Sequence, residues 1–171
     1  VILAVNGEPV VTFGDVERAV VECERVELEL LRNGELRSCT VPTNVLDTWG
    51  TQEVLIWQGL AVQPAHRGVA QLGFMPFEGG GVYVSYFSYG SPAHRYAINP
   101  KMWIKEVDGT PTPTISAFVE ATAKLAPGAA VRLRTVDLHG KEGAHTLKLD
   151  DHFWGTQHFQ MRDGEWLAVP S

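Results

Sequence analysis

The chain has 171 residues, 44% of them hydrophobic and 20% charged, which is typical of a globular protein with one or two small domains. Its net charge of −6 argues against nucleic acid or an anionic membrane as a partner, because phosphate contacts need clustered Lys and Arg. No apolar run reaches the roughly 20 residues needed to cross a bilayer, so we expect no membrane span.

A short pattern occurs twice in the sequence. Residues 1–10 read VILAVNGEPV, residues 103–113 read WIKEVDGTPTP, and their glycines, Gly7 and Gly109, lie 102 positions apart. After each copy come a helical stretch, a strand, a turn and another strand. Self-similarity at this period predicts two tandem copies of one small domain, the first of which lacks its beginning. We therefore expect this sequence to be a segment of a longer protein.

Residues 1–46 predict a β-α-β-β unit, the C-terminal half of a domain. A strand and an Asn-Gly turn lead into a helix that Thr12 is placed to cap. Apolar residues recur along this helix at helical spacing and predict a buried stripe of Phe13, Val16, Ala19 and Val20. A second Asn-Gly pair then joins two strands, 25–31 and 35–41, as a hairpin. The strands that complete this half are expected from upstream sequence or from another chain.

Residues 47–53 are polar and predict a linker, after which 54–155 predict a complete copy and 156–171 an aromatic C-terminal tail. The elements predicted in the complete copy are a strand at 54–62, a helix at 66–72, a strand at 82–87, a short helix opening at Ser91-Pro92, a strand at 102–107, a helix at 114–125 and a hairpin of 131–136 with 145–149. The predicted fold class is therefore mainly β with short helices (α+β).

The order of these elements, and several motifs within them, resemble a PDZ domain of the HtrA/Deg type. The motifs that carry the circularly permuted PDZ order are GVYV (81–84), GSPA (90–93), WIKEVDG (103–109) and TPTISAF (112–118). Longer stretches are similar to the C-terminal PDZ region of the long, multi-PDZ Deg proteases of plants and their fungal counterparts, namely 63–74, 131–141 and 145–154. The resemblance implies one complete PDZ copy preceded by the C-terminal half of another.

The resemblance also implies a peptide-binding groove. Backbone N–H groups of a glycine-containing loop can bind a terminal carboxylate, while the strand after the loop pairs with the added peptide. Carried over position by position, the groove consists of Gly59, Leu60, Ala61, Val62 and Gln63, with Ile115, Val119 and Thr122 on the facing helix. Ala61 departs from the family pattern, which has Gly there. The alternative interpretation is that all of these residues are ordinary core.

The sequence carries no recognisable catalytic or metal-binding pattern. It has neither a Gly-Asp-Ser-Gly segment nor a Gly-x-Ser-x-Gly elbow, and helix capping accounts for Ser91. The six histidines lack metal-ligand spacing, so we expect no metal, no cofactor and no catalytic centre within this chain. Cys23 and Cys39 are expected to be free thiols.

The leading hypothesis is a non-catalytic PDZ region of a Deg/HtrA-type serine protease. Its partners would be peptides or unfolded-protein segments captured by strand addition, or other protomers of the parent protease. One alternative is a purely structural assembly module whose groove is covered by the tail aromatics Phe153, Trp154 and Phe159. Another is a PDZ scaffold unrelated to any protease. The resemblance implies an intracellular location, the chloroplast stroma in a plant or alga and the nucleus in a fungus.

Overall fold

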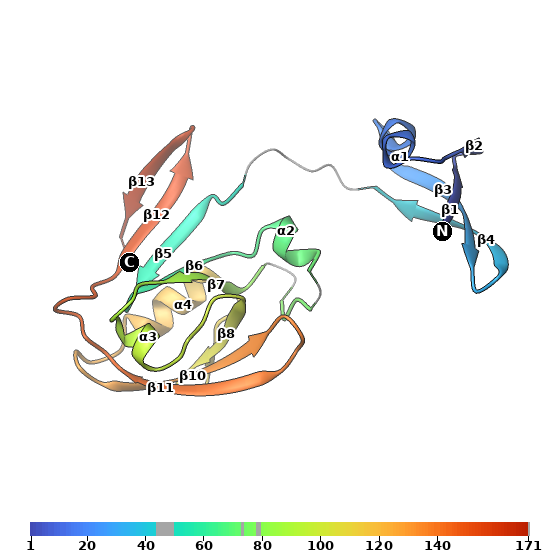
Figure 1. The fold of residues 1–171 in the computed structure, drawn as a ribbon. Helices are drawn as coiled ribbons and strands as arrows, with labels where there is room; N and C mark the ends of the chain where they lie inside the picture. Colours follow the sequence, from blue (N-terminus) through green and yellow to red (C-terminus); the bar gives the residue numbers. More distant parts are fainter. Residues whose placement is uncertain (44–49, 73, 78–79, 171) are drawn as a thin grey trace. The chain divides into compact units, whose positions relative to one another are not determined.

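The structure is a computed structural model that describes residues 1–43, 50–72, 74–77 and 80–170. The chain divides into two compact units, Val1–Asp47 and Thr48–Ser171. Both units are mainly β with a few short helices, which confirms the predicted fold class and is consistent with a PDZ-type fold (Figure 1). The predicted linker, 47–53, starts outside the described residues, and its last residue, Glu53, already belongs to a strand of the second unit.

The first unit is a four-stranded antiparallel sheet with one helix. Its elements in chain order are β1 (Ile2–Val5), β2 (Glu8–Pro9), α1 (Phe13–Val20), β3 (Arg25–Arg32) and β4 (Glu35–Pro42), and the sheet order is β2-β1-β3-β4. Thr12 caps α1 as predicted, because its Oγ1 accepts the Asp15 N–H at 3.3 Å while the Asp15 carboxylate accepts the Thr12 N–H at 2.8 Å.

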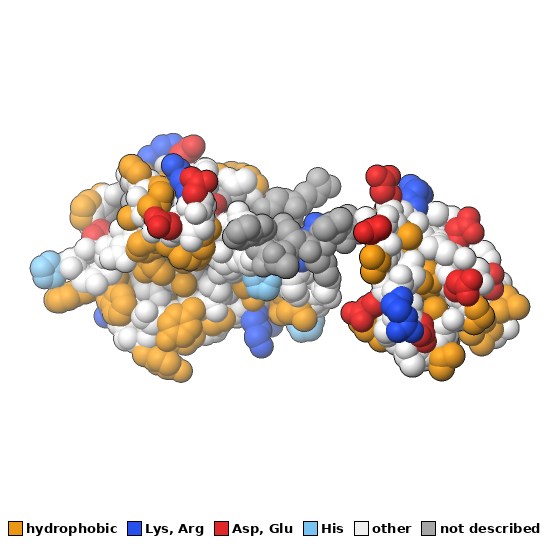
Figure 2. Space-filling model, turned by 90° about the horizontal axis from the view of Figure 1, so that it is seen from above, with side chains coloured by type: hydrophobic (Ala, Val, Ile, Leu, Met, Phe, Trp, Pro, Cys, Tyr) orange, Lys and Arg blue, Asp and Glu red, His pale blue; other side chains and the backbone are white. Residues whose placement is uncertain are grey.

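The stripe predicted on α1 is not buried. No described residue of α1 is fully buried: Phe13 is 77% exposed, and Val16, Ala19 and Val20 are half-buried. Hydrophobic side chains accordingly lie at the surface of this unit, among acidic ones (Figure 2). The physical reason is architectural, since one small sheet and one helix have no second layer that could enclose the outer side of the helix.

The second unit is a larger antiparallel sheet that curves around one helix, α4 (Figure 1). Its strands are β5 (Glu53–Trp57), β6 (Leu60–Gln63), β7 (Val82–Phe87), β8 (Met102–Val107), β9 (Thr110–Pro111), β10 (Ala130–Asp137), β11 (Glu142–Lys148), β12 (Gln157–Arg162) and β13 (Glu165–Val169). Its helices are α2 (Arg67–Ala70), α3 (Pro92–Arg95) and α4 (Ile115–Thr122). The order is β11-β10-β8-β7-β6-β5-β12-β13, with β9 paired to β8.

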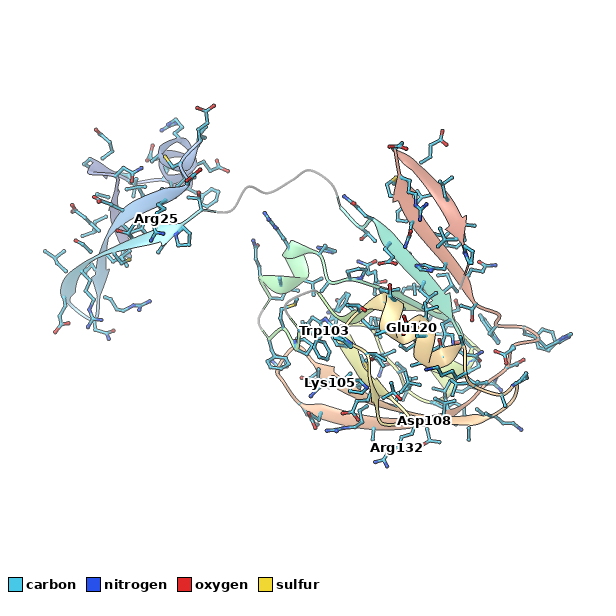
Figure 3. The ribbon with its side chains drawn as sticks, turned by 180° about the vertical axis from the view of Figure 1, so that it is seen from behind. Arg25, Trp103, Lys105, Asp108, Glu120 and Arg132 are labelled. Carbon is cyan, nitrogen blue, oxygen red and sulfur yellow. The ribbon has the colours of Figure 1, made fainter. Side chains whose placement is uncertain are left out.

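The core of this unit lies between the curved sheet and α4. Phe118 of α4 is fully buried among apolar residues from β5, β6, β7, β8 and β10. A second cluster surrounds Trp103, whose ring lies 5.1 Å from that of Tyr83 and whose Nε1–H donates to the Gly80 carbonyl at 3.0 Å. Figure 3 shows Trp103 inside the unit and Arg132 at its outer surface. The same sheet therefore separates an apolar interior from a charged exterior.

Two predicted segments have a different structure. The strand predicted at 54–62 is two strands, β5 and β6, joined by a two-residue turn at Gln58-Gly59. The predicted tail, 156–171, contains the β12–β13 hairpin, and β12 pairs with β5. Both differences extend the sheet on the side where an open edge was expected, because β5, β12 and β13 continue it beyond β6.

Candidate functional site

Strand β6 is the strand on which peptide addition was predicted, and both of its edges are paired. Leu60, Ala61 and Val62 lie opposite Trp57, Ile56 and Leu55 of β5 in an antiparallel register. The other edge of β6 pairs with β7, with a bulge between Ala61 and Val62. A guest strand therefore finds no free backbone edge on β6.

The predicted loop residues occupy a turn and a strand. Gly59 lies in the turn, whereas Leu60, Ala61, Val62 and Gln63 form β6. The side chains of Leu60 and Val62 are fully buried, and the Gln63 amide donates to Thr51 Oγ1 at 3.0 Å. These residues thus form part of the core, and their backbone is committed to the sheet.

The predicted helix residues lie on α4, beside the same core. Ile115 is buried, and Val119 is partly buried and packs against the core. The Thr122 hydroxyl donates to the Phe118 carbonyl at 2.9 Å, one turn earlier. The structure therefore brings Leu60, Val62 and Ile115 together in one cluster, with Val119 at its margin.

Strand β5 brings its own side chains to α4. Leu55 and Trp57 are buried in the core cluster that contains Ile115 and Phe118. The Trp57 and Phe118 rings meet edge to face, with centroids 5.2 Å apart and planes at 86°. β5 thus combines the two features expected of a bound peptide, since it pairs with β6 and buries alternate side chains against α4.

The turn between β5 and β6 is held by a buried amide. The Gln58 side chain is fully buried; its Nε2 donates to Asp151 Oδ1 at 2.8 Å and its Oε1 accepts the Asp150 N–H at 2.7 Å. Gln58 and Gly59 both have positive φ, 50° and 83°, as a type I′ turn requires. The segment after β11 therefore fixes the end of the hairpin at which a peptide carboxylate would lie.

Gly59 is also required for steric reasons. A Cβ atom at this position would lie 2.1 Å from the Cβ of Ser91, which is the N-cap of α3. Ser91 Oγ accepts the His94 N–H at 3.2 Å, so this serine has the capping role that the sequence predicted. The turn thus packs directly on the start of α3.

A second set of contacts holds β5 from its outer side. The Glu53 carboxylate of β5 accepts from His158 Nε2 at 2.8 Å and from the Gln160 amide at 3.0 Å. His158 is buried, and β12 pairs with β5 over four residue pairs from Gln157 to Gln160. β5 is therefore an interior strand of the sheet, tied on one side to β6 and on the other to β12.

The tail aromatics take positions different from those in the alternative hypothesis. Phe153 is largely exposed, Phe159 lies on β12, and Trp154 packs near the turn, where its Cε3 would lie 3.2 Å from a Cβ on Gly59. The occupant of the β6 edge is therefore β5, upstream of the turn.

Sequence reasoning missed two hairpins, one of which had a visible signal. Asp163-Gly164, between alternating apolar residues, is a strong type I′ turn signal and does join β12 to β13. Gln58-Gly59 carries no such turn signal, because Gln is rarely found at positive φ outside special environments. Here the buried contacts of the Gln58 amide supply that environment, and they involve residues more than 90 positions away.

The outer face of the β8–β10–β11 sheet carries a network of ion pairs. Glu142 accepts from Lys105 and Arg134 at 2.8 Å each, and Arg134 also reaches Glu106 at 2.9 Å. Hydrogen bonds from Lys105 and Arg134 lower the pKa of Glu142, and the two carboxylates raise the pKa of Arg134. These pairs are partly solvent-exposed, so each contributes little to stability.

Neither a metal-binding cluster nor a membrane-spanning helix occurs among the described residues. In the described residues, no group of three or more His, Cys, Asp and Glu side chains is arranged to hold a metal ion. Across the same residues, every helix is too short or too polar to cross a membrane. Cys23 and Cys39 are unpaired thiols, and Cys39 is exposed.

Comparison with known proteins places the whole sequence within longer ones. No family model matches it. It is similar to Protease Do-like 7 of Arabidopsis thaliana, with 44% identity over 162 residues, or 91% of this chain and 15% of the relative. It is also similar to the Pro-apoptotic serine proteases NMA111 of Yarrowia lipolytica (29% over 168 residues; 98% and 17%) and nma111 of Neosartorya fischeri (31% over 158 residues; 90% and 15%). The chain therefore spans about a sixth of the length of these curated relatives.

Proposed function

Since this chain belongs to the long Deg/HtrA-type serine proteases, as a PDZ region of them, we propose that it is a non-catalytic interaction region that holds protomers together. In this proposal, hydrolysis takes place in a part of the protease outside these residues. The β6 groove does not capture free peptides, because the chain's own β5 takes their place.

One observation carries the closed-groove part of the proposal, namely that β5 pairs with β6 and buries Leu55 and Trp57 beside α4. A guest peptide would have to expel this strand, and exposing the Leu side chain alone costs about 1.5–3 kcal/mol. It would also have to compete with a strand tethered by a two-residue turn, which has a far higher effective concentration than a free peptide. Contacts of β5 with β12 add to this cost.

Peptide titration tests whether the groove is closed. We expect hydrophobic C-terminal peptides added to the 171-residue chain to show no saturable binding up to about 1 mM. A dissociation constant at that limit corresponds to a binding free energy of roughly −4 kcal/mol. Micromolar binding that is abolished by Val119→Glu but unaffected by Glu120→Ala would contradict the proposal and support capture. Glu120 is the matched control because it is exposed on the same helix.

Two further measurements test the remaining parts of the proposal. Light scattering during size exclusion should give a mass that rises with concentration above the 18.8 kDa of one copy, whereas a strict monomer would argue against assembly.

A fluorophosphonate probe, which reacts with activated serines, should label no residue of this chain. Labelling of Ser91 or any other serine would contradict a non-catalytic role.

A further inference from the structure

Strand β13 forms one end of the large sheet. In the described part of the chain, β13 pairs with β12 alone, so its other edge carries unpaired backbone groups. The opposite end, β11, is contacted by α3 and has a charged residue at each end, Glu142 and Lys148. Charges of this kind are a common protection of natural sheet edges. The two ends of the sheet therefore differ in how open they are to another strand.

The turn geometry shows which backbone groups of β13 face outward. Asp163 and Gly164, with φ of 52° and 85°, form a type I′ turn, so the flanking Arg162 and Glu165 are a hydrogen-bonded pair. Hydrogen-bonded and non-hydrogen-bonded pairs alternate along an antiparallel ladder. The N–H and C=O groups of Trp166 and Ala168 consequently point away from β12, toward the open edge.

β13 has fewer protective features than β11, since Glu165 at its start is its single charged residue. It reads EWLAV, without Lys or Pro, and its register with β12 runs from Arg162 to His158 without a bulge. Its two large apolar side chains are also accessible, because Trp166 is 45% exposed and Leu167 is 43% exposed. Such an edge favours pairing with a further strand.

We propose that β13 pairs with β13 of a second copy of this chain, antiparallel and centred on Leu167. This inference rests on the assembly role proposed above and assigns it to one strand. In this register the outward N–H and C=O groups of Trp166 form hydrogen bonds with those of Ala168 in the second copy. Those of Ala168 likewise form hydrogen bonds with Trp166 of the second copy. Leu167 then lies directly opposite Leu167 of the second copy, as a close non-hydrogen-bonded pair.

Charge is compatible with this register, and hydrogen bonding favours it over the register centred on Ala168. It places the single charged residue of the strand, Glu165, opposite the apolar Val169 of the second copy, so like charges do not meet. Shifting the centre to Ala168 would place Trp166 opposite Pro170, which has no N–H to donate. The strand is therefore complementary to itself in the register centred on Leu167, which is why a second copy is the occupant that we propose.

A charge-swap experiment tests the pairing. We expect Leu167→Lys and Leu167→Glu each to be monomeric by light scattering at concentrations where the unchanged chain forms a dimer, because each places like charges opposite one another. An equimolar mixture of the two variants should restore the dimer. Leu167 is partly exposed, so both variants should fold, and unchanged amide spectra of β8 and α4 would confirm that they do.

Other outcomes would overturn the inference in distinguishable ways. If the unchanged chain dimerises and Leu167→Lys dimerises equally well, the β13 interface is wrong while assembly through another surface stands. If the chain stays monomeric up to about 1 mM, both the interface and the assembly role are wrong. If β13 amides shift only on addition of an unrelated extended peptide, the occupant is a peptide and not a second copy.

Discussion

In each unit a helix follows the repeated strand and glycine-containing turn, yet the two helices differ in how deeply they are buried. Phe13 begins α1 and is 77% exposed, whereas Ile115 begins α4, 102 positions later, and is 2% exposed. Each helix is capped by a Thr side chain and followed by an antiparallel hairpin. In the second unit, β5, β6 and β7 add strands that have no counterpart among the described residues of the first.

This difference separates local from tertiary causes of structure. Helix and hairpin form in the first unit from capping and turn residues, although few of its side chains are buried. Burial of the equivalent positions requires the extra strands, and β5 is the strand that reaches α4 directly through Trp57. Substitutions at equivalent positions of the two units should therefore change the free energy of unfolding by different amounts.

The largest expected effect is at the start of the two helices. Ile115→Ala should lower the free energy of unfolding of the second unit by about 2–5 kcal/mol, because it leaves a cavity in a buried core. Phe13→Ala should change that of the first unit by no more than about 0.5 kcal/mol, as expected for an exposed side chain. Urea unfolding followed by NMR signals of each unit measures both. Equal losses of unfolding free energy in the two variants would show that another protein segment covers α1 in solution.

A smaller effect is expected at the turns. Gly59→Ala should destabilise the second unit by about 3 kcal/mol, through both a strained positive φ and the close approach to Ser91. Gly109 is the control, since its φ of 81° is close to the 83° of Gly59 but a Cβ there would meet nothing within 4 Å. Gly109→Ala should cost about 1–2 kcal/mol. Thermal unfolding of the two variants compares them, and equal costs would argue against the packing of the β5–β6 turn on α3.

Removing the helix caps should have similar effects in the two units. Thr12→Ala and Thr114→Ala should each cost about 1 kcal/mol, because each leaves a backbone N–H of the first turn without its acceptor. Hydrogen exchange of the first-turn amides reports the loss locally. Since capping is a local interaction, a much larger loss in the second unit would mean that Thr114 also supports tertiary packing.

The smallest expected effect is a pH dependence confined to α1. Hydrogen bonds from the Thr12 backbone and side chain and from the Val11 N–H lower the pKa of Asp15 from 3.8 to about 2, with Arg18 adding a weaker contribution. Because the folded-state pKa is depressed, this stabilisation is present above pH 3.8 and is lost as the pH falls through about 2. The Thr12 amide shift should titrate near pH 2. A midpoint near 3.8, or an unchanged titration in Asp15→Asn, would contradict it.

Local signals in the sequence predicted much of the fold. Met102–Val107 was predicted with its observed bounds, and Thr12, Ser91 and the Asn33-Gly34 turn have their predicted roles. Each depends on neighbouring residues only, which is why a single sequence suffices.

The closed groove could not be predicted in the same way. The pairing of β5 with β12 joins residues about 100 positions apart, and Gln58 adopts its turn conformation only with Asp150 and Asp151 in place. Long-range contacts of this kind leave no local pattern in the sequence. The structure brings Leu60, Val62 and Ile115 into one cluster, whereas the strand that pairs with β6 was missed.

Hydrogen exchange at two amides of β6 tests most directly whether β5 occupies the edge. The two-residue turn makes Trp57–Leu60 and Leu55–Val62 the hydrogen-bonded pairs, so the N–H groups of Leu60 and Val62 face β5. We expect both to exchange as slowly as Ile104 in the middle of the sheet. If Leu60 and Val62 exchanged at the rate of unstructured peptides while Ile104 remained protected, the edge would be open and the account wrong.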